Sequence, residues 1–198
     1  MSVLFMPSPI GVLVLQERGG ALTRVKYLDR TWNQSEPRSV PSQAEQETLA
    51  KALFQDEPAE TELLTRTKAE LKEYFSGARQ AFTLPLAPQG TEFQRRVWRE
   101  LTRVPYAALT TYGALAQAAD APRAARAVGM AMRNNPIAII QPCHRVVAAN
   151  GALTGYDGKF GLDRKRFLLR LEGITDCRSA LGFTAASNGP LICKGTQK

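Results

Sequence analysis

The sequence predicts an α/β chain of the α+β type, in which a strand-and-helix N-terminal half precedes a helical C-terminal half. Residues 9–29 hold two strand-like runs on either side of Gly19-Gly20, which is typical of a β-hairpin. Between residues 43 and 75, leucines and aromatic residues recur at helical spacing, with a break at a proline. Residues 110–136 have the pattern of a helix, a short turn and a second helix, which predicts a helix–turn–helix.

A stretch bounded by prolines separates the two halves. Residues 76–90 contain a helix stop at Gly77, a short strand-like run and prolines at positions 85 and 88. After this stretch, Thr91 is suited to cap a helix with an apolar face. We therefore expect an N-terminal α/β domain over residues 1–88, a C-terminal domain over 89–175 and a flexible tail over 176–198.

The positive charge of the protein is concentrated in its C-terminal half. The 198 residues carry a formal net charge of +8. Residues 1–90 hold 10 basic and 11 acidic side chains, whereas residues 91–198 hold 16 basic and 7 acidic ones. This uneven distribution indicates a polyanionic partner, usually a nucleic acid. A merely solubilising surface is the alternative that charge alone leaves open.

Cysteine content and hydropathy exclude several classes of protein. No apolar run approaches the ~20 residues of a membrane-spanning helix, and the apolar N-terminal stretch lacks the leader and cleavage site of a signal peptide. Cysteines stand only at positions 143, 177 and 193, which does not suit a disulfide framework. Without a membrane-spanning run, a signal peptide or a disulfide framework, we expect a cytoplasmic location and no membrane partner. CxxC and HxxxH patterns are also absent, so we expect no metal site, and we expect no cofactor.

The second helix of the predicted helix–turn–helix is made mainly of small residues. It contains Ala125, Ala127 and Gly129, with Arg126 among them. Small side chains let a helix backbone approach a groove closely, and arginines suit phosphates, so this helix is a candidate for DNA binding. A tightly packed core helix is the alternative, because alanine is the best helix former.

A cysteine and the only histidine of the chain are neighbours, Cys143 and His144. A thiol attacks carbon as the thiolate, and an imidazole can take its proton. Neighbours in a strand point to opposite faces, so contact requires a turn after Pro142 or a bridging water. A buried imidazole needs a carboxylate partner, for which Glu172 is the candidate. Asn135 precedes a proline and can hold the turn, whereas an unreactive buried cysteine is the alternative.

The sequence PCHRV at residues 142–146 is one of five motifs that follow the order and approximate spacing of a known family. The other four are residues 90–116, 123–136, 151–156 and 162–173. On these motifs the chain resembles the O6-alkylguanine-DNA alkyltransferases, also called methylated-DNA–protein-cysteine methyltransferases. A weaker resemblance covers the N-terminal half, where it implies an RNase H-like sheet.

The resemblance implies DNA repair by direct reversal of damage. Such a protein binds double-stranded DNA through its helix–turn–helix and flips an O6-alkylguanine out of the stack. It then transfers the alkyl group irreversibly to a cysteine, without turnover. By motif position, Cys143 is the acceptor, and His144 is the base that deprotonates it through a water. Glu172 orients His144, and Asn135 braces the active-site turn.

The resemblance also assigns residues to the DNA. Arg126 corresponds to the arginine that fills the space left by the flipped base. Tyr112 corresponds to the tyrosine that assists flipping and protonates the leaving guanine. The small residues Ala125, Ala127 and Gly129 are implied to let the second helix enter the minor groove, where little sequence is read.

The base pocket shows one departure from the family pattern. Tyr156 resembles the aromatic residue that lines this pocket, and backbone groups of Cys143 and Val146 are implied to contact the exocyclic amine of guanine. The loop that follows is longer than usual, and Asp157 stands where the family has a small residue. A carboxylate there can repel the guanine oxygen or restrict bulky alkyl groups, so the range of accepted alkyl groups stays open.

Three other functions fit parts of the pattern. An alkyltransferase-like protein that binds damage without repairing it would lack the nucleophile, which is present here as Cys143. A transcription regulator would carry further DNA-binding and metal-binding segments, and a cysteine hydrolase would turn over repeatedly. We expect a monomeric repair protein, nucleoid-associated if bacterial. Repair of O4-alkylthymine and cooperative binding to DNA stay open.

Overall fold

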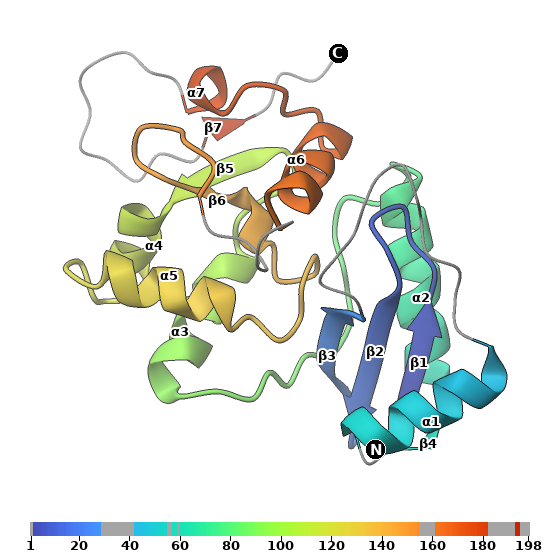
Figure 1. Cartoon of the computed structure of the whole chain (residues 1–198). Helices are drawn as coiled ribbons and strands as arrows, with labels where there is room; N and C mark the ends of the chain where they lie inside the picture. The colour runs from blue at the N-terminus through green and yellow to red at the C-terminus, as the bar shows by residue number, and fades with distance from the viewer. Residues whose placement is uncertain are drawn as a thin grey trace. The chain divides into compact units, whose positions relative to one another are not determined.

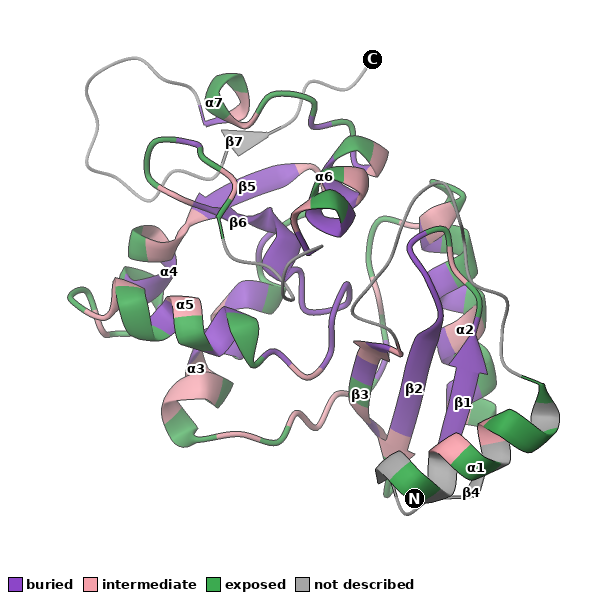
Figure 2. Ribbon diagram, in the orientation of Figure 1, coloured by how far each residue is buried: buried purple, intermediate pink, exposed green. Residues whose placement is uncertain are grey.

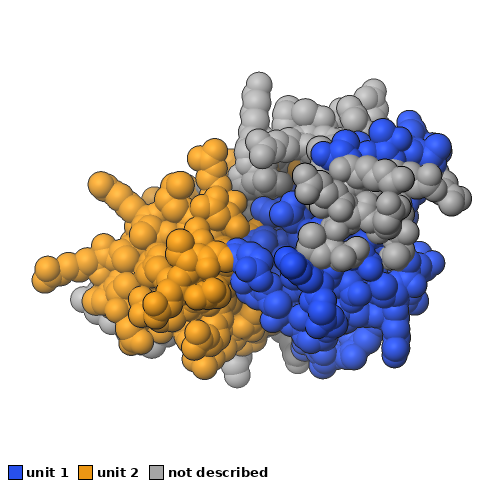
Figure 3. All heavy atoms as spheres, turned by 90° about the horizontal axis from the view of Figure 1, so that it is seen from below, with its two compact units in different colours: residues 1–89, 136–138 blue, residues 90–135, 139–198 orange. Residues whose placement is uncertain are grey.

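The computed structural model describes residues 2–28, 42–54, 57–58, 60–154, 161–181 and 193–194. Figure 1 shows the helices and strands along the chain. The chain divides into two compact units, which are coloured separately in Figure 3. Unit 1 comprises residues 1–89 with 136–138, and unit 2 comprises residues 90–135 with 139–198.

Unit 1 is built on a sheet with the strand order β3-β2-β1-β4. β1 (Ser2–Met6) pairs antiparallel with β2 (Leu13–Arg18), and β2 pairs antiparallel with β3 (Ala21–Tyr27). The short β4 (Glu57–Pro58) runs parallel to β1. Gly19 and Gly20 have φ angles of 60° and 75°, which glycine adopts without steric cost, so they close the β2–β3 turn. The predicted hairpin is confirmed.

Two helices complete unit 1, α1 (Gln43–Phe54) and α2 (Glu62–Phe75). The Thr61 side chain caps α2 by accepting a hydrogen bond from the N–H of Leu64. α2 packs on the sheet and buries Leu64, Leu71 and Tyr74, and the strands β1 and β2 are buried as well (Figure 2). The core of unit 1 therefore includes the layer between α2 and the sheet.

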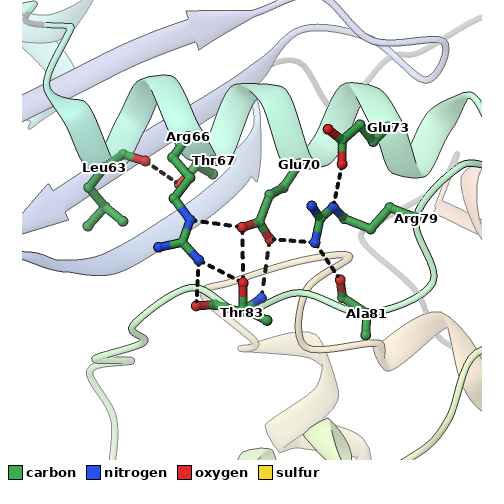
Figure 4. A network of polar contacts seen from close by, with 8 residues as sticks. All are labelled: Leu63, Arg66, Thr67, Glu70, Glu73, Arg79, Ala81 and Thr83. Atoms are coloured by element: carbon green, nitrogen blue, oxygen red, sulfur yellow. Dashed lines mark hydrogen bonds and ion pairs between the residues drawn. The ribbon is translucent and has the colours of Figure 1, made fainter.

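A polar network ties α2 to the segment that follows it (Figure 4). The buried Glu70 carboxylate accepts hydrogen bonds from Nε of Arg66 at 3.0 Å and from the N–H and hydroxyl of Thr83, both at 3.2 Å. Arg79 forms a second ion pair with Glu70 at 3.4 Å. Because a buried carboxylate is stable only when it is paired, this network fixes the path of the chain after α2.

Unit 2 is mainly helical and contains a small sheet with the strand order β6-β5-β7. Its helices are α3 (Glu92–Thr102), α4 (Tyr112–Ala118), α5 (Ala125–Arg133), α6 (Gly161–Leu171) and α7 (Cys177–Ala180), and a 3₁₀ turn, η1, spans Cys143–Arg145. Its strands are β5 (Ala108–Thr111), β6 (Val146–Val147) and β7 (Cys193–Lys194). This sheet is absent from the sequence prediction, because such short strands carry no repeating pattern.

The predicted helix–turn–helix is formed by α4 and α5, which pack against each other and against α3. α3 begins with a capping box, in which the side chains of Thr91 and Gln94 each accept a hydrogen bond from the backbone N–H of the other. The indole N–H of Trp98 on α3 donates to the carbonyl of Ala131 on α5 at 2.9 Å. This buried hydrogen bond fixes the second helix of the motif to α3.

The region that the sequence predicts as a flexible tail is partly folded in the described residues. Asp176 caps α7, since its carboxylate accepts hydrogen bonds from two N–H groups of that helix. Leu181 is buried in a cluster with Leu109, Leu169 and Ile174, and β7 pairs with β5. These residues are ordered by the cap of α7 and by the burial of apolar side chains. Neither feature gives the sequence the periodic pattern from which a helix is predicted.

Candidate active site

Cys143 and His144 lie in the 3₁₀ turn η1, and both side chains are buried. Pro142 precedes the turn, and its carbonyl accepts a hydrogen bond from the N–H of Arg145 at 2.9 Å. The turn removes the opposite-face arrangement that a strand would impose on neighbouring side chains. The turn after Pro142, which the sequence offers as one of two routes to contact, is present in the structure.

His144 is fully buried and bonded to Glu172. Its Nε2 atom lies 2.7 Å from Oε1 of Glu172, a short distance typical of a hydrogen bond to an ionised carboxylate. Nδ1 has no hydrogen-bond partner among the described residues. Burial, helped by the nearby cations Arg145 and Lys165, lowers the pKa of His144, although the Glu172 carboxylate acts to raise it. The imidazole is therefore neutral at neutral pH, the state in which it can accept a proton.

Glu172 has a second partner, Arg145, which is missing from the predicted site. Nε and Nη2 of Arg145 donate to the two carboxylate oxygens, both at 2.9 Å, and Nη1 donates to the carbonyl of Val104 at 2.6 Å. Burial alone would raise the pKa of Glu172, but His144 and Arg145 hold it well below its usual range. Since His144 is neutral, the guanidinium is the charge that keeps Glu172 ionised. A charged residue within an apolar run was the available signal, because buried charges are normally paired.

The position of Glu172 follows from the end of α6. The helix ends at Leu171, and the N–H of Glu172 still donates to the carbonyl of Leu168. The N–H of Ala107 donates to Oε2 of Glu172 at 3.2 Å, and the hydroxyl of Tyr106 donates to the carbonyl of Leu171 at 3.1 Å. The carboxylate is therefore held from the segment before β5 as well as from η1.

Asn135 braces the backbone that leads into η1. Its Nδ2 donates to the carbonyl of Gln141 at 2.8 Å, and the N–H of Cys143 donates to the same carbonyl at 2.8 Å. Between them, Ile139 has a φ of 73°, which is rare for a β-branched residue and costs about 1–3 kcal/mol. The hydrogen bond from Asn135 and the burial of Ile139 stabilise this strained turn.

The carbonyl of Thr154 accepts hydrogen bonds from two helices. The hydroxyl of Tyr112 donates to it at 3.0 Å and Nζ of Lys165 at 3.2 Å, and Lys165 also donates to the carbonyl of Val146 at 2.5 Å. Burial raises the pKa of Tyr112 and lowers that of Lys165 to about 8, and both groups interact electrostatically with Cys143. At neutral pH the thiol therefore has a neutral phenol and a cation in its surroundings. Lys165, like Arg145, is missing from the predicted site.

The predicted DNA-contacting residues of the second helix lie on α5. Arg126 and Ala127 are exposed, whereas Ala125 and Gly129 are half-buried. A Cβ atom added at Gly129 would meet no other atom within 4 Å. Packing within unit 2 therefore does not explain why position 129 is a glycine, and close approach of an external surface stays a reason for it.

The remaining expectations concern the base pocket, metals and membranes. Tyr156 and Asp157 lie outside the described residues, and Val146 is fully buried with its carbonyl bonded to Lys165. Within the described ranges, no three His, Cys, Asp or Glu side chains are grouped so as to hold a metal ion. None of the helices in those ranges combines the length and the hydropathy that a membrane span requires.

Comparisons with known proteins cover both halves of the chain. Residues 3–88 match the description "6-O-methylguanine DNA methyltransferase, ribonuclease-like domain", and residues 92–174 match "6-O-methylguanine DNA methyltransferase, DNA binding domain". A methylated-DNA–protein-cysteine methyltransferase from Mycobacterium leprae is 44% identical over 167 residues, which are 84% of this chain and 89% of the relative. These matches confirm the predicted ribonuclease-like domain and the DNA-binding domain that follows it.

Two solved structures are similar as well. The O6-methylguanine methyltransferase of Mycobacterium tuberculosis matches with a TM-score of 0.69 at 38% identity, over 86% of this chain and 92% of that chain. The structure of Mycobacterium tuberculosis OGT in complex with DNA matches with a TM-score of 0.69 at 38% identity, over 87% of this chain and 92% of that chain.

Proposed function

The chain belongs to the 6-O-methylguanine DNA methyltransferase family, and on that premise we propose that it repairs O6-alkylguanine in double-stranded DNA by transferring the alkyl group to Sγ of Cys143. The observation that carries this assignment is the buried network in which Glu172 binds both His144 and Arg145. His144 follows Cys143 directly in the turn η1. Such a network supplies the base that a thiol nucleophile needs.

The reaction conserves atoms and electrons without any further reactant. Neutral His144 takes the thiol proton through a water bonded to Nδ1. The thiolate attacks the alkyl carbon, so that an S–C bond forms and the C–O6 bond breaks with its electron pair passing to guanine. Tyr112 supplies the proton that the guanine takes up and regains one from His144 through solvent. The product thioether is stable, so each molecule reacts once.

Charges around the thiol favour this proton transfer. When His144 gains a proton, it forms an ion pair with a carboxylate that Arg145 already keeps ionised. The ammonium group of Lys165 interacts electrostatically with Cys143 and stabilises its thiolate. The buried site thus offers a stabilised partner to each charge that the first step creates.

On the DNA side, we assign α5 to the minor groove. Ala127 is exposed, and Ala125 and Gly129 present no bulk, so the helix backbone can approach the groove closely. Arg126 is exposed on the same helix and is assigned to the space that the flipped base leaves. Phosphate contacts by arginines would give affinity without sequence readout.

We assign the base pocket to η1 and to the loop after β6. Backbone groups of Cys143 and Val146 contact the exocyclic amine of the base. The carbonyl of Val146 has two lone pairs and retains one after it accepts the bond from Lys165. By their motif position alone, we also assign Tyr156 and Asp157 to this pocket. On this assignment the reaction takes place in residues 89–175 of a monomer that works in the cytoplasm.

An intact-mass measurement after incubation with a duplex containing one O6-methylguanine tests the proposal. We expect the protein mass to rise by one methyl group, and peptide mapping to place that group on Cys143. The matched control is Cys177→Ser. Cys177 is more exposed than Cys143, but burial raises its pKa and the chain's only histidine is bonded elsewhere, so this variant should be methylated like the wild type.

Two outcomes separate repair from mere recognition of damage. Cys143→Ala should still bind the duplex but show no mass increase. Wild-type protein that binds the duplex while its mass and the lesion stay unchanged would instead identify a damage-binding protein that does not repair.

A further inference from the structure

Among the described residues, Met130 is the one large hydrophobic side chain that is exposed, with 55% of its surface accessible. It lies on α5, the second helix of the helix–turn–helix. A single exposed apolar side chain is common on protein surfaces and needs no partner of its own. The position of Met130 on this helix is what points to a ligand.

The exposed side of α5 combines Met130 with two arginines. At about 100° per residue, Arg126, Met130 and Arg133 fall within an arc of about 60° around the helix axis. Arg126 and Arg133 are exposed, whereas Val128 and Ala131 on the opposite side are buried. Along the helix, Met130 therefore lies between two cations, on the surface that faces away from the core.

The charge of this surface selects the kind of partner. A second copy of the chain also carries a net charge of +8 and would bring cations against cations. DNA brings phosphates for the arginines, and the walls of its minor groove are formed by the C–H groups of deoxyribose. A face with a thioether between two guanidinium groups complements sugars flanked by phosphates.

We propose that Met130 packs against the sugar walls and base edges of the minor groove beside the flipped nucleotide, and contributes a part of the DNA affinity that does not depend on salt. This inference rests on the proposed function, in which α5 enters the minor groove. Met130 follows Arg126 by four residues, about 6 Å along the helix axis. This distance corresponds to roughly two base steps of about 3.4 Å, so the contact is with neighbouring nucleotides and not with the damaged one.

The chemistry of methionine suits this contact. Its side chain is unbranched and polarisable, so it adapts to the irregular surface of a groove. Proteins that bind the minor groove often place apolar side chains against or between base steps. A contact without hydrogen bonds reads no bases, which fits a protein that must bind damage in any sequence context.

Met130→Ala tests the contact through the affinity for an undamaged duplex at several salt concentrations. We expect the Kd to rise roughly 3- to 10-fold at each concentration. The slope of log K against log salt should stay unchanged, because an apolar contact releases no counterions. Met130→Leu keeps the apolar volume and should retain most of the affinity.

Arg133→Ala is the matched control on the same side of α5. It should weaken binding and also reduce the salt slope by about 1, as expected for the loss of one phosphate contact. A Met130→Ala protein with the wild-type Kd would overturn the inference. So would a Met130→Ala protein whose salt slope falls as it does in Arg133→Ala.

Oxidation by hydrogen peroxide provides a second measurement on the unaltered protein. Sulfoxide formation at Met130 should slow when undamaged duplex is added, whereas the buried Met6 should react at the same low rate with and without DNA. An unchanged rate at Met130 in DNA-bound protein would contradict the contact. Methyl transfer to Cys143 separates the two proposals. If transfer and DNA binding persist, while DNA does not slow the oxidation of Met130 and Met130→Ala leaves the Kd unchanged, only this inference fails.

Discussion

At the scale of single residues, the guanidinium of Arg145 sets the charge of the buried site. This planar group donates to both oxygens of Glu172. His144 can therefore gain a proton beside a carboxylate that is already ionised. The protonation step creates a paired charge and avoids an isolated one, which lowers its free energy in a buried environment.

Arg145→Lys should slow alkyl transfer while the DNA affinity stays near that of the wild type. Lysine keeps the charge, but it cannot reproduce the fork that donates to both Glu172 oxygens and to Val104. Loss of one charge-assisted hydrogen bond is worth about 1.5–3 kcal/mol, so we expect roughly a 10-fold or larger fall in the single-turnover rate. The rate is measured at saturating methylated duplex, and a wild-type rate would contradict the positioning role.

The pH dependence of transfer should report the lowered pKa of His144. The neutral imidazole is the base, so the rate falls as the pH drops through this pKa. Because burial shifts the pKa below the ordinary value of 6.5, more than half of His144 is neutral at pH 6.5. Single-turnover rates at saturating DNA should therefore reach half of their maximum below pH 6.5. A midpoint at or above that pH would show that burial does not control this group.

At the scale of elements, the segments with a repeating pattern were predictable and those held by distant contacts were not. The β2–β3 hairpin, α2 and the helix–turn–helix carry turn signals or helical periodicity in their own residues. The strands β5, β6 and β7 are short, and α7 spans one turn, so no local pattern distinguishes them from loops. These elements are held in place by strand pairing and by burial against residues that are distant in the sequence.

Glu70 should matter more for the stability of unit 1 than its exposed neighbour Glu73. Glu70→Gln keeps an acceptor for Thr83 but loses both ion pairs of a buried carboxylate, so we expect a loss of about 1–2 kcal/mol. This figure allows for screening, because Arg66 is half exposed. Glu73→Gln breaks a surface pair with Arg79 and should cost less than about 0.5 kcal/mol. Urea unfolding of both variants measures the difference, and equal losses would show that burial of Glu70 adds nothing.

At the scale of the whole molecule, the positive charge and the candidate site belong to the same half of the sequence. Cys143, His144, Glu172 and Asn135 were predicted as one site. In the structure His144 is bonded to Glu172, and Asn135 and the N–H of Cys143 both donate to the carbonyl of Gln141. Arg145 and Lys165 were not predicted, although both belong to that site. For Arg145 the neighbouring apolar residues were the one available signal, whereas Lys165 stands between two arginines and nothing in the sequence marks it as buried. Its burial is decided by the packing of several elements.

Many polar side chains of the site donate hydrogen bonds to main-chain carbonyl oxygens. Asn135 binds the oxygen of Gln141, Arg145 that of Val104 and Tyr106 that of Leu171, while Tyr112 and Lys165 share that of Thr154. A main-chain oxygen is present whichever amino acid occupies the position. Evolutionary drift at positions 104, 141, 154 and 171 can therefore proceed without deleting these anchors, as long as the backbone keeps its course.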